Sequence, residues 1–370
     1  MKGDERMSAN KEVTIYGAGM SGLVAAINLA REGYHVVLHD REKGYGGDPQ
    51  YNPSTHTTPI YVDDMSQYIG IDISSAFHPV TSCPFYFNDT RVEMGVSGNY
   101  TVERGNRPTS LDTLLYKQAQ ALKVEFAFKS ALKEKDLGHL PPNTIIACGL
   151  TPSVYKMLEV PYLVWEGWIS RGECGFSGHS WINFMKGITE YGYLSSCNNY
   201  YFNLLFSIRP VSRETLDNYR RFMVRHEGME HDEWHYAKGC VPIADPGNPR
   251  LFHKNMIMCG TISGFMDPFG WFGIVGALTS GKIAALAVTD PQLARREFER
   301  FSRMFSQMYF VKNQIWYRFI REHVDMMEKA VRLIGPQRLG RLHQELMKNH
   351  FQQHRTMPFA IPGFAVMACN

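Results

Sequence analysis

The period of the hydrophobic pattern changes twice within the first forty residues. Residues 13–16 (VTIY) form a short β-favouring run, residues 23–32 place apolar side chains on one face of a helix, and residues 34–38 return to β-favouring residues. The turn between the first run and the helix reads GAGMSG, and Gly33 ends the helix. The pattern predicts a strand, a tight turn, a helix and a second strand.

The predicted turn carries glycines at the G-x-G-x-x-G spacing, namely Gly17, Gly19 and Gly22. The first permits the tight turn, the second lets the backbone approach a pyrophosphate, and the third lets the helix pack close to the strand. Met20 and Ser21 open the helix, whose N-terminal N–H groups and dipole attract phosphate. These residues are therefore predicted to bind the phosphates of a dinucleotide.

An acidic residue closes the second predicted strand. Asp40 lies about 20 residues beyond the glycines, where a carboxylate can hydrogen-bond a ribose hydroxyl, and Arg41 follows it at the start of a loop. Both are predicted to contact the cofactor. A chance glycine turn is the alternative, but the strand, the helix and the acid all agree with a dinucleotide site.

Two later regions extend the predicted site. Residues 98–105 read as a strand that carries Arg104, a helix begins at residues 109–112, and residues 144–149 read as a buried strand ending at Gly149. A buried strand over residues 255–260 precedes a glycine-rich turn and a helix over residues 274–288. From this second landmark the predicted cofactor contacts are Asp267, Gly270, Phe272, Gly273 and Ile274.

The helix predicted over residues 274–288 favours a flavin over a nicotinamide cofactor. Its N-terminus follows a Pro-x-Gly turn, and a helix dipole aimed at a flavin ring stabilises the negative charge of the reduced form. Its small residues, Gly276, Ala277, Ser280, Gly281, Ala284 and Ala285, predict close packing. The expected cofactor is FAD.

Between residues 151 and 250 aromatic residues become dense and alternate with other β-formers, which predicts an antiparallel sheet. The sheet could wall an apolar substrate pocket, or its aromatics could simply fill a core. Four side chains in this region are candidate proton donors, but no pattern singles one out, so the catalytic residues stay unassigned. The candidates are Tyr200, Tyr201, His235 and Cys240.

Composition limits the other functions. The chain has 370 residues, 44% of them hydrophobic, and a net charge of +3, which does not favour a nucleic-acid partner. Seven scattered cysteines without a C-x-x-C pair predict neither a disulfide framework nor a metal site, and fit a reducing cytosol. The polar N-terminus and the lack of an apolar run of about 18 residues predict neither a secretory signal nor a transmembrane helix.

The charge is unevenly distributed along the chain. Residues 291–370 hold 13 Lys and Arg against 6 Asp and Glu, a net charge of +7, which leaves −4 for the rest. Most of this segment reads as helix, with apolar and aromatic residues on one face and arginines on the other. We expect a helical cap over the substrate domain, with a helix that contacts a membrane surface or a partner as the alternative. The expected location is cytoplasmic or peripheral to a membrane.

With these stretches together, the sequence resembles the FAD-dependent flavoprotein group of geranylgeranyl reductases, aromatic-ring hydroxylases and flavin halogenases. The resemblance covers residues 12–50, 98–150 and 238–290. Besides the glycines and Asp40, it rests on Tyr100-x-Val102-x-Arg104, Asp112, Leu115, Val241-Pro242 and Asp267-Pro268-Phe269-Gly270-x-x-Gly273-Ile274. The group usually has Gly-Asp where this chain has Gly260-Thr261; the Thr261 hydroxyl or Asp267 could take over from the missing ribityl-binding acid.

The resemblance implies an α/β fold: a Rossmann-like FAD-binding domain of glutathione-reductase type, an inserted antiparallel substrate domain and C-terminal helices. The expected bounds are 8–50, 96–150 and 238–290 for the FAD domain, 51–95 and 151–237 for the substrate domain, and 291–355 for the helices.

Two motifs that mark other sub-branches of this group are absent from this sequence. One is the Asp-Gly dipeptide of NADPH-dependent aromatic hydroxylases, and the other is the Trp-x-Trp-x-x-Pro motif of flavin halogenases. The resemblance then implies reduction of C=C bonds in an apolar, isoprenoid-like substrate by hydride transfer from flavin N5, with an external electron donor. A flavin monooxygenase, and a flavin-binding pathway partner with degraded catalysis, are the alternatives.

Overall fold

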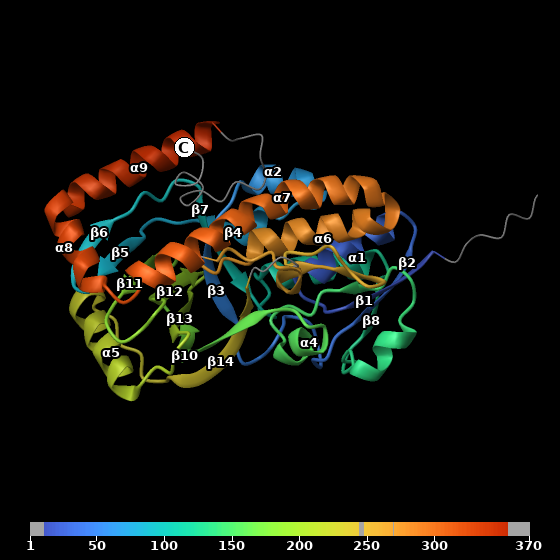
Figure 1. Ribbon diagram of the computed structural model, residues 1–370, viewed down its shortest axis with the longest axis horizontal. Helices are drawn as coiled ribbons and strands as arrows, with labels where there is room; N and C mark the ends of the chain where they lie inside the picture. Colours follow the sequence, from blue (N-terminus) through green and yellow to red (C-terminus); the bar gives the residue numbers. More distant parts are fainter. Residues whose placement is uncertain (1–10, 244–247, 269, 354–370) are drawn as a thin grey trace, which may run out of the picture.

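The computed structural model describes residues 11–243, 248–268 and 270–353 and contains the two predicted sheets. The first sheet is parallel except for its edge pair β15–β16, and β1 pairs with β2 and β9 on either side. This confirms the predicted Rossmann-like sheet, seen on the right of Figure 1. Its order is β15 (Phe252–His253), β16 (Met256–Met258), β9 (Ile145–Ile146), β1 (Glu12–Tyr16), β2 (His35–His39) and β8 (Glu125–Ala127).

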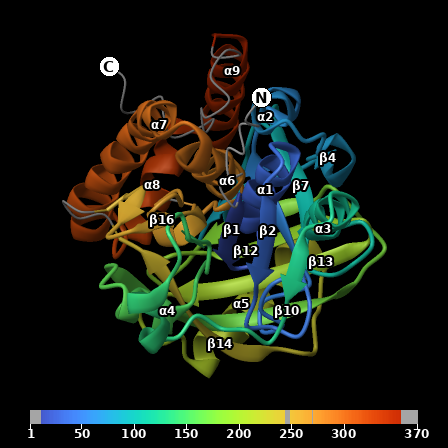
Figure 2. The ribbon, with the colours of Figure 1, turned by 90° about the vertical axis from the view of Figure 1, so that its right-hand side faces the viewer.

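Helix α1 (Met20–Arg31) packs between α3 (Leu111–Ala121) and α6 (Ile274–Thr289), as Figure 2 shows. The small residues of α6 allow this close packing: a Cβ on Gly281 would lie 2.6 Å from the Ser21 carbonyl oxygen, and one on Gly276 would lie 2.2 Å from the Phe265 carbonyl oxygen. The predicted start of α3 is also confirmed, since the Ser110 side chain accepts a hydrogen bond from the Thr113 N–H at 3.1 Å.

The second sheet has seven strands, and all neighbours are antiparallel except β11 and β5. Helix α5 (Arg213–Glu227) covers one face of it. The predicted domain boundary at residue 238 falls inside the edge strand β14. The strand order is β14 (His235–Pro242), β10 (Tyr162–Glu173), β13 (Tyr200–Ser207), β12 (Gly192–Cys197), β11 (Ser180–Phe184), β5 (Pro84–Phe87) and β6 (Thr90–Glu93).

A small antiparallel sheet joins the two halves. Strand β7 (Asn99–Arg104) lies between β3 (Ser54–Pro59) and β4 (Phe77–Pro79), and β3 also contacts β12 and β13 of the seven-stranded sheet. Short helices complete this part of the chain: α2 (Val62–Ile69), η1 (Ser74–Ala76), η2 (Glu134–His139), α4 (Pro152–Met157) and η3 (Gly260–Ser263).

The C-terminal segment is helical, as predicted, and runs from α6 to the far end of the seven-stranded sheet (Figure 1). Phe301 and Phe305 of α7 are buried against Phe265. Gly335 and Pro336 separate the last two helices. No helix within the described ranges is both long and apolar enough to span a bilayer. The elements are α7 (Pro291–Val311), the π-helical η4 (Lys312–Ile320), α8 (Val324–Ile334) and α9 (Pro336–Gln353).

Candidate functional site

A cavity of about 380 Å³ lies where the carboxyl ends of the parallel strands face the seven-stranded sheet. In open parallel sheets ligands bind outside the carboxyl ends of the strands. The volume falls in the range of about 300–1,000 Å³ that is usual for ligand sites. The cavity brings together most of the predicted cofactor contacts: Gly17, Gly19, Met20, Ser21, Asp40, Arg41, Arg104, Gly149, Gly270, Phe272, Gly273 and Ile274.

The three glycines of the first turn have different surroundings. Gly17 has a φ of +116°, and a Cβ on it would lie 2.2 Å from the Ala147 carbonyl oxygen. A Cβ on Gly22 would lie 1.9 Å from the Gly17 carbonyl oxygen, and Gly22 does not line the cavity. A Cβ on Gly19 would meet nothing within 4 Å and would project from a cavity-lining residue. Gly17 and Gly22 therefore serve the fold, whereas Gly19 keeps space open at the cavity.

Two helix N-termini open into this cavity. Helix α1 begins after Gly19 and α6 begins after Gly273, and neither of these N-cap residues supplies a side-chain cap. The first N–H groups of a helix have no partner within it, and the positive end of the helix dipole adds to their attraction for anions. The pair of termini fits a ligand with anionic or electron-rich groups at two separate places, as in a flavin dinucleotide.

Asp40 and Arg41 lie at the cavity, at the end of β2. One carboxylate oxygen of Asp40 accepts the Ala18 N–H at 2.6 Å and the other accepts the Glu42 N–H at 2.8 Å, which fixes the side chain beside the glycine turn. The Arg41 guanidinium donates to Glu42 at 3.0 Å and to Asp48 at 2.5 Å. A carboxylate held in this place suits a ribose hydroxyl.

Arg104 reaches the cavity from the end of β7 and is held by a buried acid. Its Nε and Nη2 donate to the two oxygens of Asp112 at 2.6 and 3.1 Å, and the Gly105 N–H donates to the same carboxylate at 3.0 Å. Such a two-point pair fixes the plane of the guanidinium as well as its position. Arg104 is thus presented to the cavity in one orientation.

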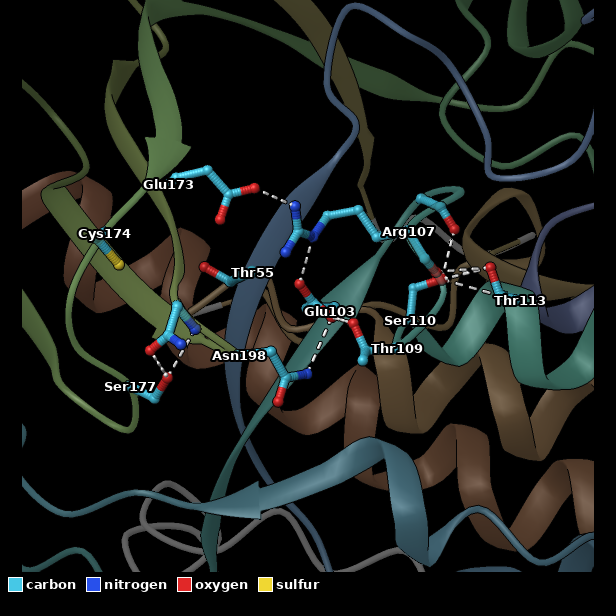
Figure 3. Close-up of polar contacts among 12 residues, drawn as sticks. Thr55, Glu103, Arg107, Thr109, Ser110, Thr113, Glu173, Cys174, Ser177 and Asn198 are labelled. Carbon is cyan, nitrogen blue, oxygen red and sulfur yellow. Dashed lines mark hydrogen bonds and ion pairs between the residues drawn. The ribbon is translucent and has the colours of Figure 1, made fainter.

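The loop after Arg104 is tied to the seven-stranded sheet by a second acid, which the sequence did not reveal (Figure 3). The fully buried Glu103 accepts Arg107 Nε at 2.8 Å and Asn198 Nδ2 at 3.0 Å, and also accepts the Thr109 hydroxyl. Arg107 in turn donates to Glu173 of β10 at 2.6 Å. A buried charge needs such donors, and these contacts join the end of β7 and its loop to β10 and to Asn198 between β12 and β13.

Asp267 does not line the cavity. It is fully buried, and its Oδ2 accepts the Gly270 N–H within its own turn. Its carboxylate therefore shapes the turn before α6 and is not placed to receive a ribityl hydroxyl. Thr261 does line the cavity, with a Cβ on Gly273 lying 3.4 Å from its methyl group. Of the two predicted replacements for the missing acid, the structure brings only Thr261 to the site.

The opposite wall of the cavity is aromatic and comes from the face of the seven-stranded sheet that α5 does not cover. The sheet's periodicity of two places these residues on one face. The sequence showed the density of aromatics but not which of them share this face. The wall consists of Trp165, Ile169, Tyr191, Tyr193, Phe202, Leu204, Phe206 and Val241, with Met266 and Trp271 from the turn before α6.

His56 of β3 also lines this part of the cavity, and no sequence motif marks it. Its Nε2 lies 2.9 Å from the Ser54 hydroxyl, which donates to Asn52 Oδ1 at 2.9 Å, and its ring lies 5.8 Å from that of Phe202. Burial, with a smaller contribution from Arg104, lowers the pKa of His56 to about 3. The imidazole is therefore neutral at pH 7 and can form hydrogen bonds without adding charge.

None of the four candidate proton donors lines the cavity. Tyr200 lies under the guanidinium of Arg107 at 4.4 Å, and Tyr201 stacks on His231 at 4.0 Å. His235 is exposed at the start of β14. Cys240 neighbours the cavity-lining Val241, so strand alternation turns its side chain away, and burial raises its thiol pKa to about 12.

Comparisons with known proteins match the first predicted strand, turn and helix and the overall fold. The family profile described as an NAD(P)-binding Rossmann-like domain matches residues 15–62. The flavin-containing monooxygenase FMO GS-OX2 of Arabidopsis thaliana is 44% identical over 55 residues, which are 15% of this chain and 12% of that protein. The chain thus matches only a small part of the length of this curated relative, and the match is confined to a short segment.

Two solved structures resemble the whole chain. A geranylgeranyl bacteriochlorophyll reductase-like protein from Thermoplasma acidophilum has a TM-score of 0.68 at 14% identity, covering 94% of this chain and 97% of that one. The flavin-dependent halogenase CmlS has a TM-score of 0.63 at 14% identity, covering 90% and 72%. These likenesses show the fold. Together with the matched dinucleotide segment, they support the FAD-dependent flavoprotein group and the FAD cofactor that the sequence predicted.

Proposed function

We propose that this chain, which has the fold of flavin-dependent oxidoreductases, reduces a C=C bond of a bulky apolar substrate with FAD as cofactor. One observation carries the proposal: a single cavity is lined on one side by the uncapped N-termini of α1 and α6 and on the other by aromatic side chains. A dinucleotide and an apolar molecule can therefore meet in the same space.

The residues of the parallel-sheet side have distinct binding roles. The N-terminus of α1 and the open space at Gly19 would hold the pyrophosphate, and Asp40 would bind a ribose hydroxyl. The N-terminus of α6 would face the flavin ring and stabilise negative charge there, and the Thr261 hydroxyl would serve the ribityl chain. FAD supplies hydride transfer when bound.

The aromatic wall selects apolar molecules because its hydroxyl groups are used elsewhere. The Tyr191 hydroxyl donates to the Gly270 carbonyl oxygen, and the Tyr193 hydroxyl donates to the Thr55 carbonyl oxygen at 3.2 Å and accepts the Thr57 N–H at 2.8 Å. The rings, rather than polar tips, are thus left to line the cavity. Such a surface favours a hydrocarbon such as an isoprenoid chain over a charged or sugar-like substrate.

The whole-chain likeness to the geranylgeranyl bacteriochlorophyll reductase-like structure favours reduction. The identity to flavin-containing monooxygenases supports an alternative, the insertion of one oxygen atom into the substrate. That identity covers only 55 residues, which are 15% of this chain. We therefore place reduction first and monooxygenation second. In both cases the reducing equivalents come from an external donor.

The test is anaerobic. The purified protein is loaded with FAD, reduced with dithionite, and mixed with a polyprenyl alcohol. We expect the flavin to re-oxidise with formation of one saturated bond per flavin. If re-oxidation instead needs oxygen and yields a hydroxylated product, the monooxygenase alternative holds. If no product forms from any apolar substrate, with or without oxygen, while FAD stays bound, the chain binds flavin without this chemistry.

A further inference from the structure

The exposed apolar surface of this protein is concentrated on its C-terminal helices. Nine large hydrophobic side chains are exposed within the described residues, and six of them lie between residues 310 and 342. Single exposed hydrophobics are ordinary on soluble proteins, but their concentration on adjoining helices marks an interaction surface. The six are Phe310, Ile315, Met326, Leu333, Ile334 and Leu342.

Helix α8 has two apolar faces. Val324 and Val331 are buried against the protein, where α8 contacts β5 and β6. Met326, Ala330 and Leu333 follow the i, i+4, i+7 spacing on the opposite face and are exposed, Leu333 to 89%. The first face explains how the helix docks onto its own chain, whereas the side chains of the second face are exposed. This outer stripe continues to Ile334 at the end of the helix.

The helices α8 and α9 also carry exposed cations. Lys329 lies beside the outer stripe on α8, and Arg338 and Arg341 are exposed on α9, which follows after Gly335. Within the described part of the chain none of these three forms a salt bridge. The acids of α8 are used toward the body of the protein instead: Asp325 pairs with Lys186 at 2.7 Å, and Glu328 accepts from Thr90 and Asn88. Glu345 is the exposed acid of α9.

We propose that the outer faces of α8 and α9 bind the surface of an anionic lipid bilayer. The apolar stripe of Met326, Ala330 and Leu333 would enter the headgroup boundary, with Lys329, Arg338 and Arg341 against lipid phosphates. Peripheral helices bind in this way, through buried apolar area together with attraction to anionic lipid. Residues 291–370 carry a net charge of +7 against −4 for the remainder, so the C-terminal segment that includes α8 and α9 is the more cationic part of the chain.

Charge also argues for a bilayer over a second copy of this chain. A symmetric dimer through the same face would bring the three cations of one copy close to those of the other, and like charges repel. Helix α8 lies at the end of the molecule farthest from the parallel sheet (Figure 1), so a flat surface can reach it without obstruction from the six-stranded sheet. This inference does not depend on the reaction proposed for the cavity.

The test measures co-sedimentation of the full-length protein with vesicles. We expect binding to vesicles of phosphatidylcholine mixed with phosphatidylglycerol, weak binding to phosphatidylcholine alone, and release by high salt. Replacing Lys329, Arg338 and Arg341 with Gln should lower the partition coefficient on the order of 100-fold, at about fivefold per cation. The pair Met326→Ser and Leu333→Ser should lower it about tenfold or more.

Matched controls come from other surfaces. Val224→Ser removes an apolar side chain of α5 that is 51% exposed, and Lys117→Gln removes an exposed cation of α3. Both controls should bind vesicles like the wild type, and all variants should keep the wild-type melting temperature, so that loss of binding does not report misfolding.

Three outcomes would overturn the proposal. One is equal binding to neutral and anionic vesicles. Another is a molecular mass in solution that rises from monomer to dimer as the protein concentration increases and returns to the monomer value in Leu333→Ser. This would make the face a dimer interface. The third is binding that survives all α8 and α9 changes and is lost only when residues 354–370 are removed.

Discussion

Trp181 and Trp165 stand on opposite faces of the same seven-stranded sheet, and they differ in what lies beyond them. Trp181 is fully buried beneath α5, and its indole N–H donates to the Tyr219 hydroxyl at 3.0 Å, which donates to Asn203 at 2.9 Å. Trp165 is packed by Tyr51 and Phe206 but lines the cavity. The face that carries Trp181 packs into a filled core, whereas the face that carries Trp165 borders the cavity.

The two faces differ in the hydrogen-bond partners of their tyrosine hydroxyl and tryptophan N–H groups. On the covered face they bond to one another and to side chains of α5, which locks the helix to the sheet. On the cavity face the tyrosine hydroxyls bond to backbone groups, and the rings remain available to a ligand. The covered face should therefore matter for stability, and the cavity face for binding.

The largest expected effect is on the covered face. Trp181→Ala should lower the free energy of unfolding by about 3–5 kcal/mol, because it empties a filled site and leaves the Tyr219 hydroxyl without its donor. Phe202→Ala on the cavity face should cost less than half of this, since the ring already borders open space. Urea unfolding of both variants measures the difference, and equal losses would contradict the contrast between the two faces.

A buried ion pair behind the cavity face gives a second test. Lys312 of the π-helical segment donates to Glu190 at 2.9 Å, and both side chains are almost completely buried. Lys312→Met would leave a charge without this partner, and should destabilise the protein by about 3 kcal/mol. Combining it with Glu190→Leu should restore most of the loss. If the single and double variants unfold alike, the pair does not act as a unit.

The third test is the pH dependence of stability that His56 imposes. Its pKa in the folded protein is about 3, below the 6.5 expected when unfolded, so the unfolded chain binds the additional proton between these values. His56 should therefore cost about 1.4 kcal/mol of stability per pH unit as the pH falls below 6.5. His56→Asn should flatten this part of the curve in urea unfolding series, and an unchanged slope would show that the imidazole titrates freely.

The smallest expected effect concerns Tyr193, whose hydroxyl we assign to the backbone and not to chemistry. Tyr193→Phe should cost about 1 kcal/mol, because the Thr57 N–H and the Thr55 carbonyl lose a partner. Turnover of bound substrate should stay within about twofold of the wild type, since no proton is taken from this group. A loss of turnover of about 100-fold or more with unchanged substrate binding would instead make Tyr193 a catalytic acid.

The sequence predicted the parallel half well because its signals are local. The glycine turn, the helix after it and Asp40 follow one another within thirty residues, and each has a physical role that its neighbours do not alter. The small residues of α6 likewise predicted a close helix contact, and the structure places this contact at Ser21. For the aromatic sheet the sequence left two alternatives, a pocket wall or a filled core, because it does not reveal which face α5 covers.

The residues that the sequence missed depend on distant partners. Strand β3 reads STHTTP and has no apolar alternation, yet it is buried because its hydroxyls reach the seven-stranded sheet, as Thr55 does at the Ser195 carbonyl. His56 enters the cavity as a consequence. Glu103 is buried for the same reason, with Asn198 as a donor 95 positions away. Asp267 was predicted from its acid type, and the sequence does not reveal that it is buried outside the cavity with its Oδ2 bonded within its own turn.

The most direct test of the shared cavity is FAD binding by the wild type and by Gly19→Val. The Gly19 φ of −80° suits any residue and its Cβ meets nothing, so the variant should fold, with a loss of about 1 kcal/mol because Val is a poorer helix N-cap than Gly. We predict that the wild type takes up one FAD per chain and shows the visible bands of oxidised flavin, whereas Gly19→Val takes up none. A wild type that binds no FAD, or a variant that binds it equally well, would contradict the account.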